Sequence, residues 1–381
     1  MKFSLSFALK SFVISAAAAG MFTGCGPSDG LSDLASGKAA YEADDFKRAE
    51  KLLAKSLEDV PGRTDTLVYM ALAKLALADL DGAENAISTA SNYSADDVDV
   101  KLLAAQIAWH KKDYSKAEKL YKEVSDNLSN DAAIRSQAWC GRGVVATTCD
   151  EPDMARIAFL TAIRLDRKNA AAWYNLGILY RDAFGYLEAA LENLNIYVRL
   201  DTEATPRMAK VQRTVIPGLQ DSIRRALAER PGASKRNSAA SASALSSAES
   251  AFRKGEYKTA ASKYEEAFKL DTLSYPAALG LAKALEKQKQ ASSSRVFEAY
   301  RAACTLRAGA VSTYLTAGAL AARLGRHAEA REIYSRAVAA DAQSIDALDG
   351  LIRALVKLDG LKKQAAAYQR YREMIKPIKR K

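Results

Sequence analysis

Residue types that could carry out chemistry are scarce in this 381-residue sequence. Its histidines and cysteines are His110 and His327, and Cys25, Cys140, Cys149 and Cys304. No His and Cys are spaced as zinc ligands. Gly37-Lys38 lacks the upstream Gly and the following Ser or Thr of a phosphate-binding loop. We therefore expect no metal, no cofactor and no catalytic residue, and we predict that the protein is not an enzyme.

Three of the cysteines are expected to be structural. Cys140 and Cys149 are nine residues apart, which corresponds to about 13 Å along a helix. A disulfide needs Cα atoms within about 7 Å, so this pair is not expected to bond. We interpret Cys140, Cys149 and Cys304 as small buried residues.

The two histidines also favour structural interpretations. His327 occupies a position that holds Tyr or Phe in similar segments of the chain, which indicates a packing role. His110 precedes Lys111 and Lys112 at the end of an expected helix, and we predict that it is solvated.

Cys25 stands at the end of a segment that has the parts of an export signal. Lys2 and Lys10 precede an apolar stretch, 11–21, and small residues follow it. Phe22-Thr23-Gly24-Cys25 resembles the lipobox of bacterial lipoproteins, although Phe22 replaces the usual Leu. The resemblance implies cleavage after residue 24 and lipidation of Cys25. Ordinary signal cleavage and an uncleaved membrane anchor are the alternatives.

The tether after the lipidation site, residues 25–30, is short and contains Gly26, Pro27 and Gly30. Five extended residues span at most about 18 Å, so the folded part would begin close to the bilayer. Asp after the cysteine marks inner-membrane retention in enterobacterial lipoproteins, and this chain has Gly26 there. We therefore expect an exported, lipid-anchored protein, with the periplasmic face of the outer membrane favoured over the inner membrane.

Residues 170–201 have the pattern of two packed helices. The two helices carry Trp173, Leu176, Gly177 and Tyr180, and then Ala190, Leu194 and Tyr197, at helical spacing. Gly177 has no side chain, which allows the second helix to approach closely.

The second-helix pattern recurs along the chain: a small residue, usually Ala, is followed by a large residue four positions later and by a small or apolar residue three positions after that. It occurs at Ala49/Leu53/Ser56, Ala83/Ile87/Ala90, Ala117/Tyr121/Val124, Ala155/Phe159/Ala162, Ala260/Tyr264/Ala267, Val296/Tyr300/Ala303, Ala330/Tyr334/Ala337 and Gln364/Tyr368/Tyr371. Several successive repeats start 34 residues apart. The pattern and its period resemble the tetratricopeptide repeat (TPR). The resemblance implies an all-α solenoid of about nine helix hairpins.

Deviations from the period predict the domain boundaries. Four extra residues at 127–131 and two near 291–294 are assigned to loops. We expect an N-terminal array at 30–201, a kinked helix or degenerate repeat plus a flexible linker at 202–240, and a C-terminal array at 241–381. Pro217-Gly218 is the expected helix interruption.

Binding is expected on the concave side, which the first helices of stacked hairpins line. Rigid aromatic residues beside an Arg are typical of binding surfaces. The candidate peptide- or protein-binding residues are Tyr41, Trp109, Tyr174, Ile178, Arg181, Phe252 and Leu315. The alternative is that each packs against the next hairpin.

The formal net charge of +11 suits an acidic partner, but no nucleic-acid-binding motif is present. We predict a non-catalytic scaffold that binds envelope proteins or peptides and no nucleic acid. One alternative is an adaptor for cell-wall enzymes, whose basic linker and tail (362–381) contact anionic polymer or lipid. The other is an enzyme that uses the array as a substrate groove. The oligomeric state is not predicted.

Overall fold

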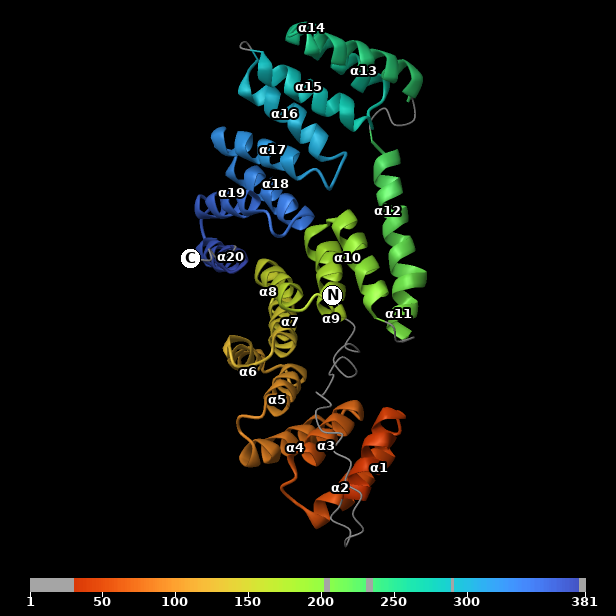
Figure 1. Cartoon of the computed structure of the whole chain (residues 1–381), viewed down its shortest axis with the longest axis vertical. Helices are drawn as coiled ribbons and strands as arrows, with labels where there is room; N and C mark the ends of the chain where they lie inside the picture. Colours follow the sequence, from red (N-terminus) through yellow and green to blue (C-terminus); the bar gives the residue numbers. More distant parts are fainter. Residues whose placement is uncertain (1–30, 202–205, 231–235, 289–290, 377–381) are drawn as a thin grey trace. The chain divides into compact units, whose positions relative to one another are not determined.

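The computed structural model describes residues 31–201, 206–230, 236–288 and 291–376. The predicted signal, Cys25 and the tether lie outside these ranges, as do 231–235 of the predicted linker and the last five residues. The described residues form helices and turns and no strand, which confirms the all-α hairpin fold (Figure 1). None of the described helices has both the length and the apolar composition needed to cross a membrane.

The chain divides into two compact units, Met1–Asn175 (unit 1) and Leu176–Lys381 (unit 2). The division falls inside a helix, α9 (Ala170–Leu179). Unit 1 contains α1 (Leu31–Glu42), α2 (Phe46–Asp59), α3 (Thr64–Ala76), α4 (Leu80–Tyr93), α5 (Val98–His110), α6 (Tyr114–Asp126), α7 (Ala132–Thr148) and α8 (Pro152–Leu165). Each odd-numbered helix packs against the even-numbered helix that follows it.

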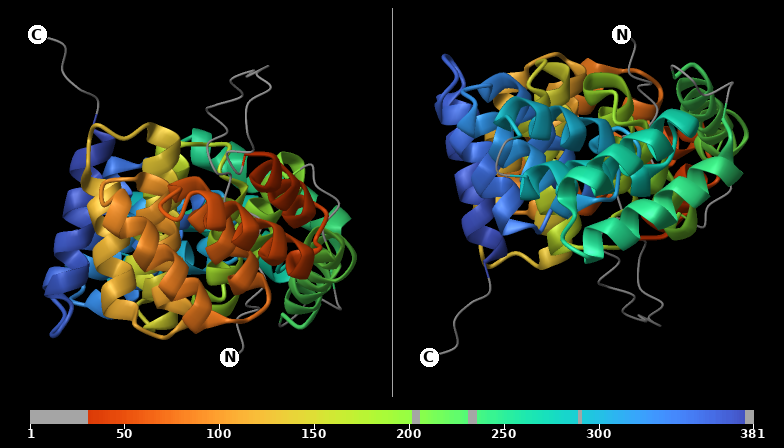
Figure 2. Two further views of the ribbon diagram at one scale, coloured as in Figure 1. Left: turned by 90° about the horizontal axis from the view of Figure 1, so that it is seen from below. Right: turned by 90° about the horizontal axis from the view of Figure 1, so that it is seen from above.

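Unit 2 continues with a π-helical turn, Tyr180–Phe184, and then further hairpins. Its helices are α10 (Leu187–Leu200), α11 (Pro206–Lys210), α12 (Ile216–Ala228), α13 (Ser238–Arg253), α14 (Tyr257–Leu270), α15 (Tyr275–Lys287), α16 (Ser293–Cys304), α17 (Val311–Arg323), α18 (His327–Ala340), α19 (Ile345–Val356) and α20 (Lys362–Ile375). Figure 2 shows α13 and α14, in green, lying side by side.

The predicted second-helix pattern forms the hairpin cores. Ala49, Leu53 and Ser56 are completely buried, and the corresponding residues of the other hairpins are buried too, apart from the half-buried Gln364. A Cβ atom on Gly177 would lie 2.8 Å from the Leu194 side chain. The close approach predicted for Gly177 is therefore confirmed.

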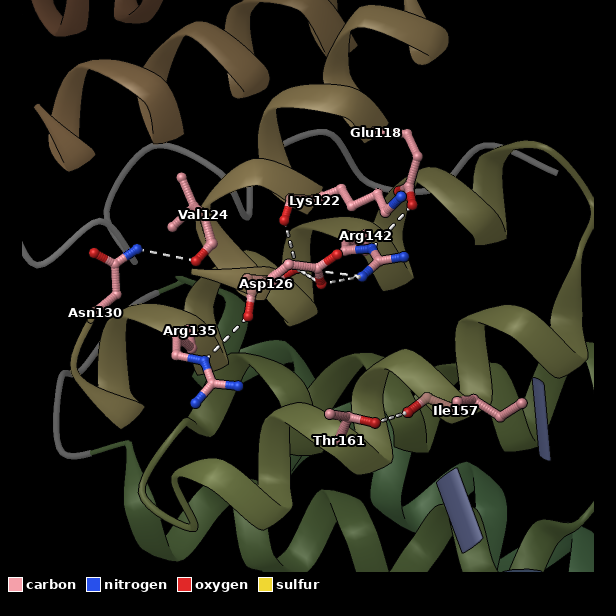
Figure 3. Close-up of polar contacts among 10 residues, drawn as sticks. Glu118, Lys122, Val124, Asp126, Asn130, Arg135, Arg142, Ile157 and Thr161 are labelled. Atoms are coloured by element: carbon pink, nitrogen blue, oxygen red, sulfur yellow. Dashed lines mark hydrogen bonds and ion pairs between the residues drawn. The ribbon is translucent and has the colours of Figure 1, made fainter. Parts of the chain in front are cut away.

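The lengthened loop between α6 and α7 lies at 127–131, as predicted, and polar side chains hold it (Figure 3). The last carbonyl groups of a helix lack partners within the helix. Here Asn130 Nδ2 donates to the Val124 carbonyl at 3.0 Å, and Arg135 Nε donates to the Ser125 carbonyl at 3.1 Å. Arg142 of α7 binds Glu118 of α6 at 2.9 Å, so side chains on both helices fix the longer connection.

The segment before α13 is helical from Pro206 to Ala228, and its π-helical stretch, Val211–Val215, ends two residues before Pro217. Proline has no N–H to donate, and a π-helical stretch changes the local hydrogen-bond pattern. Helix α13 begins at Ser238, inside the linker predicted to reach residue 240. Asn237 Oδ1 accepts from the Ala240 N–H at 3.0 Å, and this cap starts the helix earlier than the composition suggests.

Candidate protein-interaction surface

Tyr41 is half-buried on α1 and packs against the core of the first hairpins. Its ring centroid lies 5.5 Å from that of Phe46 and 5.9 Å from that of Tyr69. Burial, followed by the proximity of Tyr69 and Asp44, raises the pKa of Tyr41 to about 12. Tyr41 therefore contributes to packing and retains a partly exposed edge.

Trp109 is half-buried at the end of α5. Its indole Nε1 donates to Thr148 Oγ1 of α7 at 3.0 Å, and its ring meets His110 edge-on at 4.9 Å. The side chain thus joins the first helices of two successive hairpins.

Three candidates from the 170–201 hairpin have different environments. Tyr174 is half-buried, whereas Ile178 is only 7% exposed and offers little surface to a partner. Arg181 makes two hydrogen bonds to its neighbour Asp182, at 2.5 and 2.8 Å. The arginine charge is therefore already neutralised by an adjacent carboxylate.

The two candidates in the C-terminal array lie on α13 and α17. Phe252 is half-buried, and its ring lies 5.4 Å from Tyr257 and 6.5 Å from Tyr264, within its own hairpin. Leu315 is half-buried, and Ala319, one turn further along α17, is exposed. The sequence-predicted residues thus lie on separate hairpins, and binding by any of them stays a prediction.

Helix α5 carries polar groups that were not among the candidate binding residues. It packs against α4 and α6 and touches α3 and α7 on its flanks. Leu103 and Ile107 join the core cluster of the first two hairpins, and Leu102 joins the cluster of α6 and α7. An α-helix has 3.6 residues per turn, so Asp99, Gln106 and His110 fall on one side of α5. This side faces away from α4 and α6.

We call this side, with the equivalent positions on α3 and α7, the inner face. Counting 34 residues back from Gln106 gives Leu72, and counting 38 forward, across the longer loop, gives Val144. The inner face is defined by Leu72, Asp99, Gln106, His110 and Val144. In the sequence alone, nothing distinguishes Gln106 and His110 from polar residues on a solvent-exposed face of a helix.

His110 is half-buried, so the prediction that it is solvated was wrong. Its Nε2 atom is buried without a hydrogen-bond partner, and burial lowers the pKa of the imidazole. The Trp109 ring packs edge-to-face with the imidazole at 4.9 Å and contributes to this burial.

The cysteines divide into two environments. Cys140 and Cys304 are buried as predicted, and burial raises the pKa of each thiol to about 12, which makes both unreactive at neutral pH. Cys149 is exposed, which corrects the prediction that it is buried. It is the C-cap of α7, beyond the last helical turn that packs against α8. In the described part of the chain, no group of three His, Cys, Asp or Glu residues could hold a metal ion.

Within unit 2, α10 meets a helix that is distant in sequence. Tyr186, the N-cap of α10, is 4% exposed, and its hydroxyl group lies 3.0 Å from Ser335 Oγ and 3.2 Å from Glu332 Oε2 of α18. The Arg336 guanidinium lies 4.8 Å from the Tyr186 ring centroid. A cavity of about 160 Å³ adjoins this contact and is lined by Tyr186, Tyr314 and Arg336, among others.

Comparison with known proteins supports the repeat assignment. Tetratricopeptide repeat models match residues 40–107, 245–312 and 311–344. A comparison with curated protein sequences gives no match.

Two solved structures illustrate the likeness in fold. One comes from a functional characterization of pilF of Pseudomonas aeruginosa, with 15% identity over 68% of this chain and 98% of that chain, and a TM-score of 0.40. The other is a thermophilic TPR protein of Thermus thermophilus, with 17% identity over 48% of this chain and 98% of that chain, and a TM-score of 0.42. Both likenesses concern the fold alone. The family models establish that tetratricopeptide repeats are present in both units.

Proposed function

We propose that this protein is a non-catalytic scaffold of the bacterial cell envelope, tethered by a lipid on Cys25. The TPR fold is that of a protein-interaction scaffold, and the observation that carries the proposal is the set of TPR hairpins in both units. Proteins or peptides would bind on the side lined by the first helices. The export signal and the lipobox resemblance in the sequence support a location at a membrane, with the periplasmic face of the outer membrane favoured.

The competing function, an adaptor that contacts anionic wall polymer through its basic tail, has less support. Arg372 of α20 donates to Asp349 at 2.8 Å, and Lys376 pairs with Glu373 at 2.9 Å. These cations are balanced by carboxylates of the same chain, which reduces their attraction for a polyanion.

Crosslinking in the native bacterium, followed by mass spectrometry, tests the scaffold. We expect a small set of envelope proteins to be enriched with the wild-type chain and to be lost with a Cys25→Ala variant, which should leave the membrane fraction. Recovery of only neighbouring lipoproteins at background level would contradict the proposal. Membrane retention of the Cys25→Ala variant would show that Cys25 is not the anchor.

A further inference from the structure

The cavity beside the contact between α10 and α18 in unit 2 has charged side chains of both signs in its lining. Glu188 and Glu192 lie one helical turn apart on α10, and Arg336 lies on α18; all three line the cavity, whose volume is about 160 Å³. Among the described residues, no ion pair joins Arg336 to either glutamate. The opposite charges therefore border the same space without neutralising each other directly.

These charged groups retain hydrogen-bonding capacity. Arg336 Nε donates to Glu332 Oε1 at 2.9 Å, and the guanidinium lies 4.8 Å from the Tyr186 ring centroid. Within the described part of the chain, the Nη atoms of Arg336 make no hydrogen bond, and neither Glu188 nor Glu192 makes a hydrogen bond or an ion pair. The guanidinium is thus held in place by Glu332 and Tyr186 and keeps its outer N–H groups available.

The rest of the lining is aromatic or small. Tyr186 is 4% exposed and Tyr314 is 2% exposed, and the loop before α17 contributes Ala308 and Gly309. Burial, followed by the proximity of Cys304, raises the pKa of Tyr314; the Arg336 charge lowers this pKa, and the Glu188 charge raises it. Charges of both signs therefore act on one buried tyrosine in the wall of the cavity, and the small residues leave room for a small molecule.

We propose that this cavity binds a small zwitterion of the amino-acid class, with its carboxylate on Arg336 and its ammonium group between Glu188 and Glu192. The guanidinium N–H groups match the geometry of a carboxylate. An ammonium group has several donors and can bind both glutamates at once. A ligand with only one charge would leave the opposite charge of the cavity unpaired, whereas a zwitterion neutralises both kinds of group. This inference goes beyond the proposed scaffold function and does not depend on it.

A ligand in this position would connect α10 with α18, which are joined in the free chain by the contacts of Tyr186 with Ser335 and Glu332. A ligand that binds only the folded protein raises its stability. We therefore expect a bound amino acid to raise the Tm and to slow hydrogen exchange in α10 and α18.

Isothermal titration calorimetry on the purified full chain tests the proposal. The ligands are alanine, β-alanine and γ-aminobutyrate, which differ in the spacing between ammonium and carboxylate. Propionate lacks the ammonium group, and alanine methyl ester lacks the carboxylate. We expect at least one of the amino acids to bind, and both single-charge analogues to bind about tenfold or more weakly than it does.

Glu192→Gln retains the shape of the side chain and removes its charge, so it should weaken amino-acid binding by about tenfold. It should leave the Tm of the free protein unchanged, because Glu192 is exposed and its carboxylate makes no bond to the described residues. Arg336→Lys, which keeps the charge and loses the planar fork, should also weaken binding. Glu249→Gln is the matched control: Glu249 is exposed on α13 and does not line the cavity, so affinity should not change.

Three results would overturn the inference. One is the absence of binding by every amino acid in the series. Another is binding of propionate or of alanine methyl ester as tight as that of the best amino acid, which would show that one charge suffices. The third is unchanged amino-acid affinity in Glu192→Gln.

Discussion

In the first four hairpins, the residue that turns the chain into the second helix has a positive φ angle and is not glycine. These residues are Asp44, Ala78, Lys112 and Asp150, with φ between 57° and 67°. In unit 2, the corresponding turns before α10, α14, α18 and α20 contain Gly185, Gly255, Gly325 and Gly360. The left-handed conformation costs an ordinary L-residue roughly 1–2 kcal/mol, whereas glycine adopts it freely.

The residue that follows the turn differs as well. In unit 1, Asp45, Asp79 and Asp113 cap their helices by accepting a backbone N–H, whereas Glu151, after Asp150, makes no side-chain cap bond. In unit 2, no such bond is made at the turns before α10, α14, α18 and α20, although Ser292 caps α16. An N-cap of this kind contributes about 1 kcal/mol. At the first three turns of unit 1 the cap therefore offsets the strain of the left-handed residue, whereas the turns of unit 2 with a glycine have little such strain to offset. The common hairpin is set by the buried helix pattern.

Substitution of Tyr186 should give the largest effect in the comparison of the two units. Tyr186 stands at the N-cap position that Asp occupies in unit 1, and its side chain packs against α18. Tyr186→Ala should lower the stability of unit 2 by about 3–5 kcal/mol, since it removes a buried aromatic ring. Hydrogen exchange should accelerate in α10 and α18 and stay unchanged in α1–α6. Tyr186→Phe, the control, should lose about 1 kcal/mol with the hydroxyl. Equal, small effects of both substitutions would show that the contact does not stabilise unit 2.

Gly325→Ala should destabilise the protein by about 1–2 kcal/mol, because alanine would be held at the φ of 74° that glycine adopts there. Urea unfolding measures this loss. A Cβ atom at Gly325 meets no neighbouring atom within 4 Å, so a steric clash would not explain it. An unchanged unfolding midpoint would mean that the turn adjusts without strain.

Asp113→Ala should lower the stability of unit 1 by about 1 kcal/mol, because the Lys116 N–H loses its acceptor at 3.0 Å. Asp113→Asn retains a capping oxygen and should recover most of the loss. Helix α6 should show the fastest hydrogen exchange in the Ala variant. If the Asn and Ala variants behave alike, capping does not offset the strain at Lys112.

Ala78→Gly should have the smallest effect and the opposite sign, a stabilisation of about 0.5 kcal/mol. Glycine relieves the left-handed strain at φ 63°. It also has a larger conformational entropy in the unfolded chain, which offsets part of the gain in stability. The shifts in unfolding midpoint of Ala78→Gly and Gly325→Ala together measure how much the turn residue contributes to stability in each unit. A destabilised Ala78→Gly would contradict the assignment of strain to unit 1.

Helical periodicity predicted the hairpins because nearest neighbours in sequence are nearest neighbours in the stack. Leu53, Leu194 and Tyr368, for example, are buried where their spacing placed them. The contact between Tyr186 and Ser335 joins residues 149 positions apart, and no local period encodes it. It ties α10 to α18 within unit 2, whereas the sequence pattern grouped residues 187–200 with the N-terminal array.

The candidate surface was less predictable than the fold. Tyr41, Trp109 and Phe252 were selected as rigid aromatics, and each also packs against a neighbouring ring or side chain, which residue type alone does not show. Gln106 was not selected, because an amide in an expected helix carries no signal until its burial and lack of a partner are seen. A polar residue becomes informative only together with its environment.

Site-specific photocrosslinking in the living bacterium tests the central claim most directly. A photoreactive amino acid would replace Val144 on the inner face, and in a separate strain Lys119, which is exposed on α6. A scaffold that binds through its inner face predicts discrete envelope partners crosslinked from position 144 and not from position 119. The same products from both positions, or none from position 144, would contradict it.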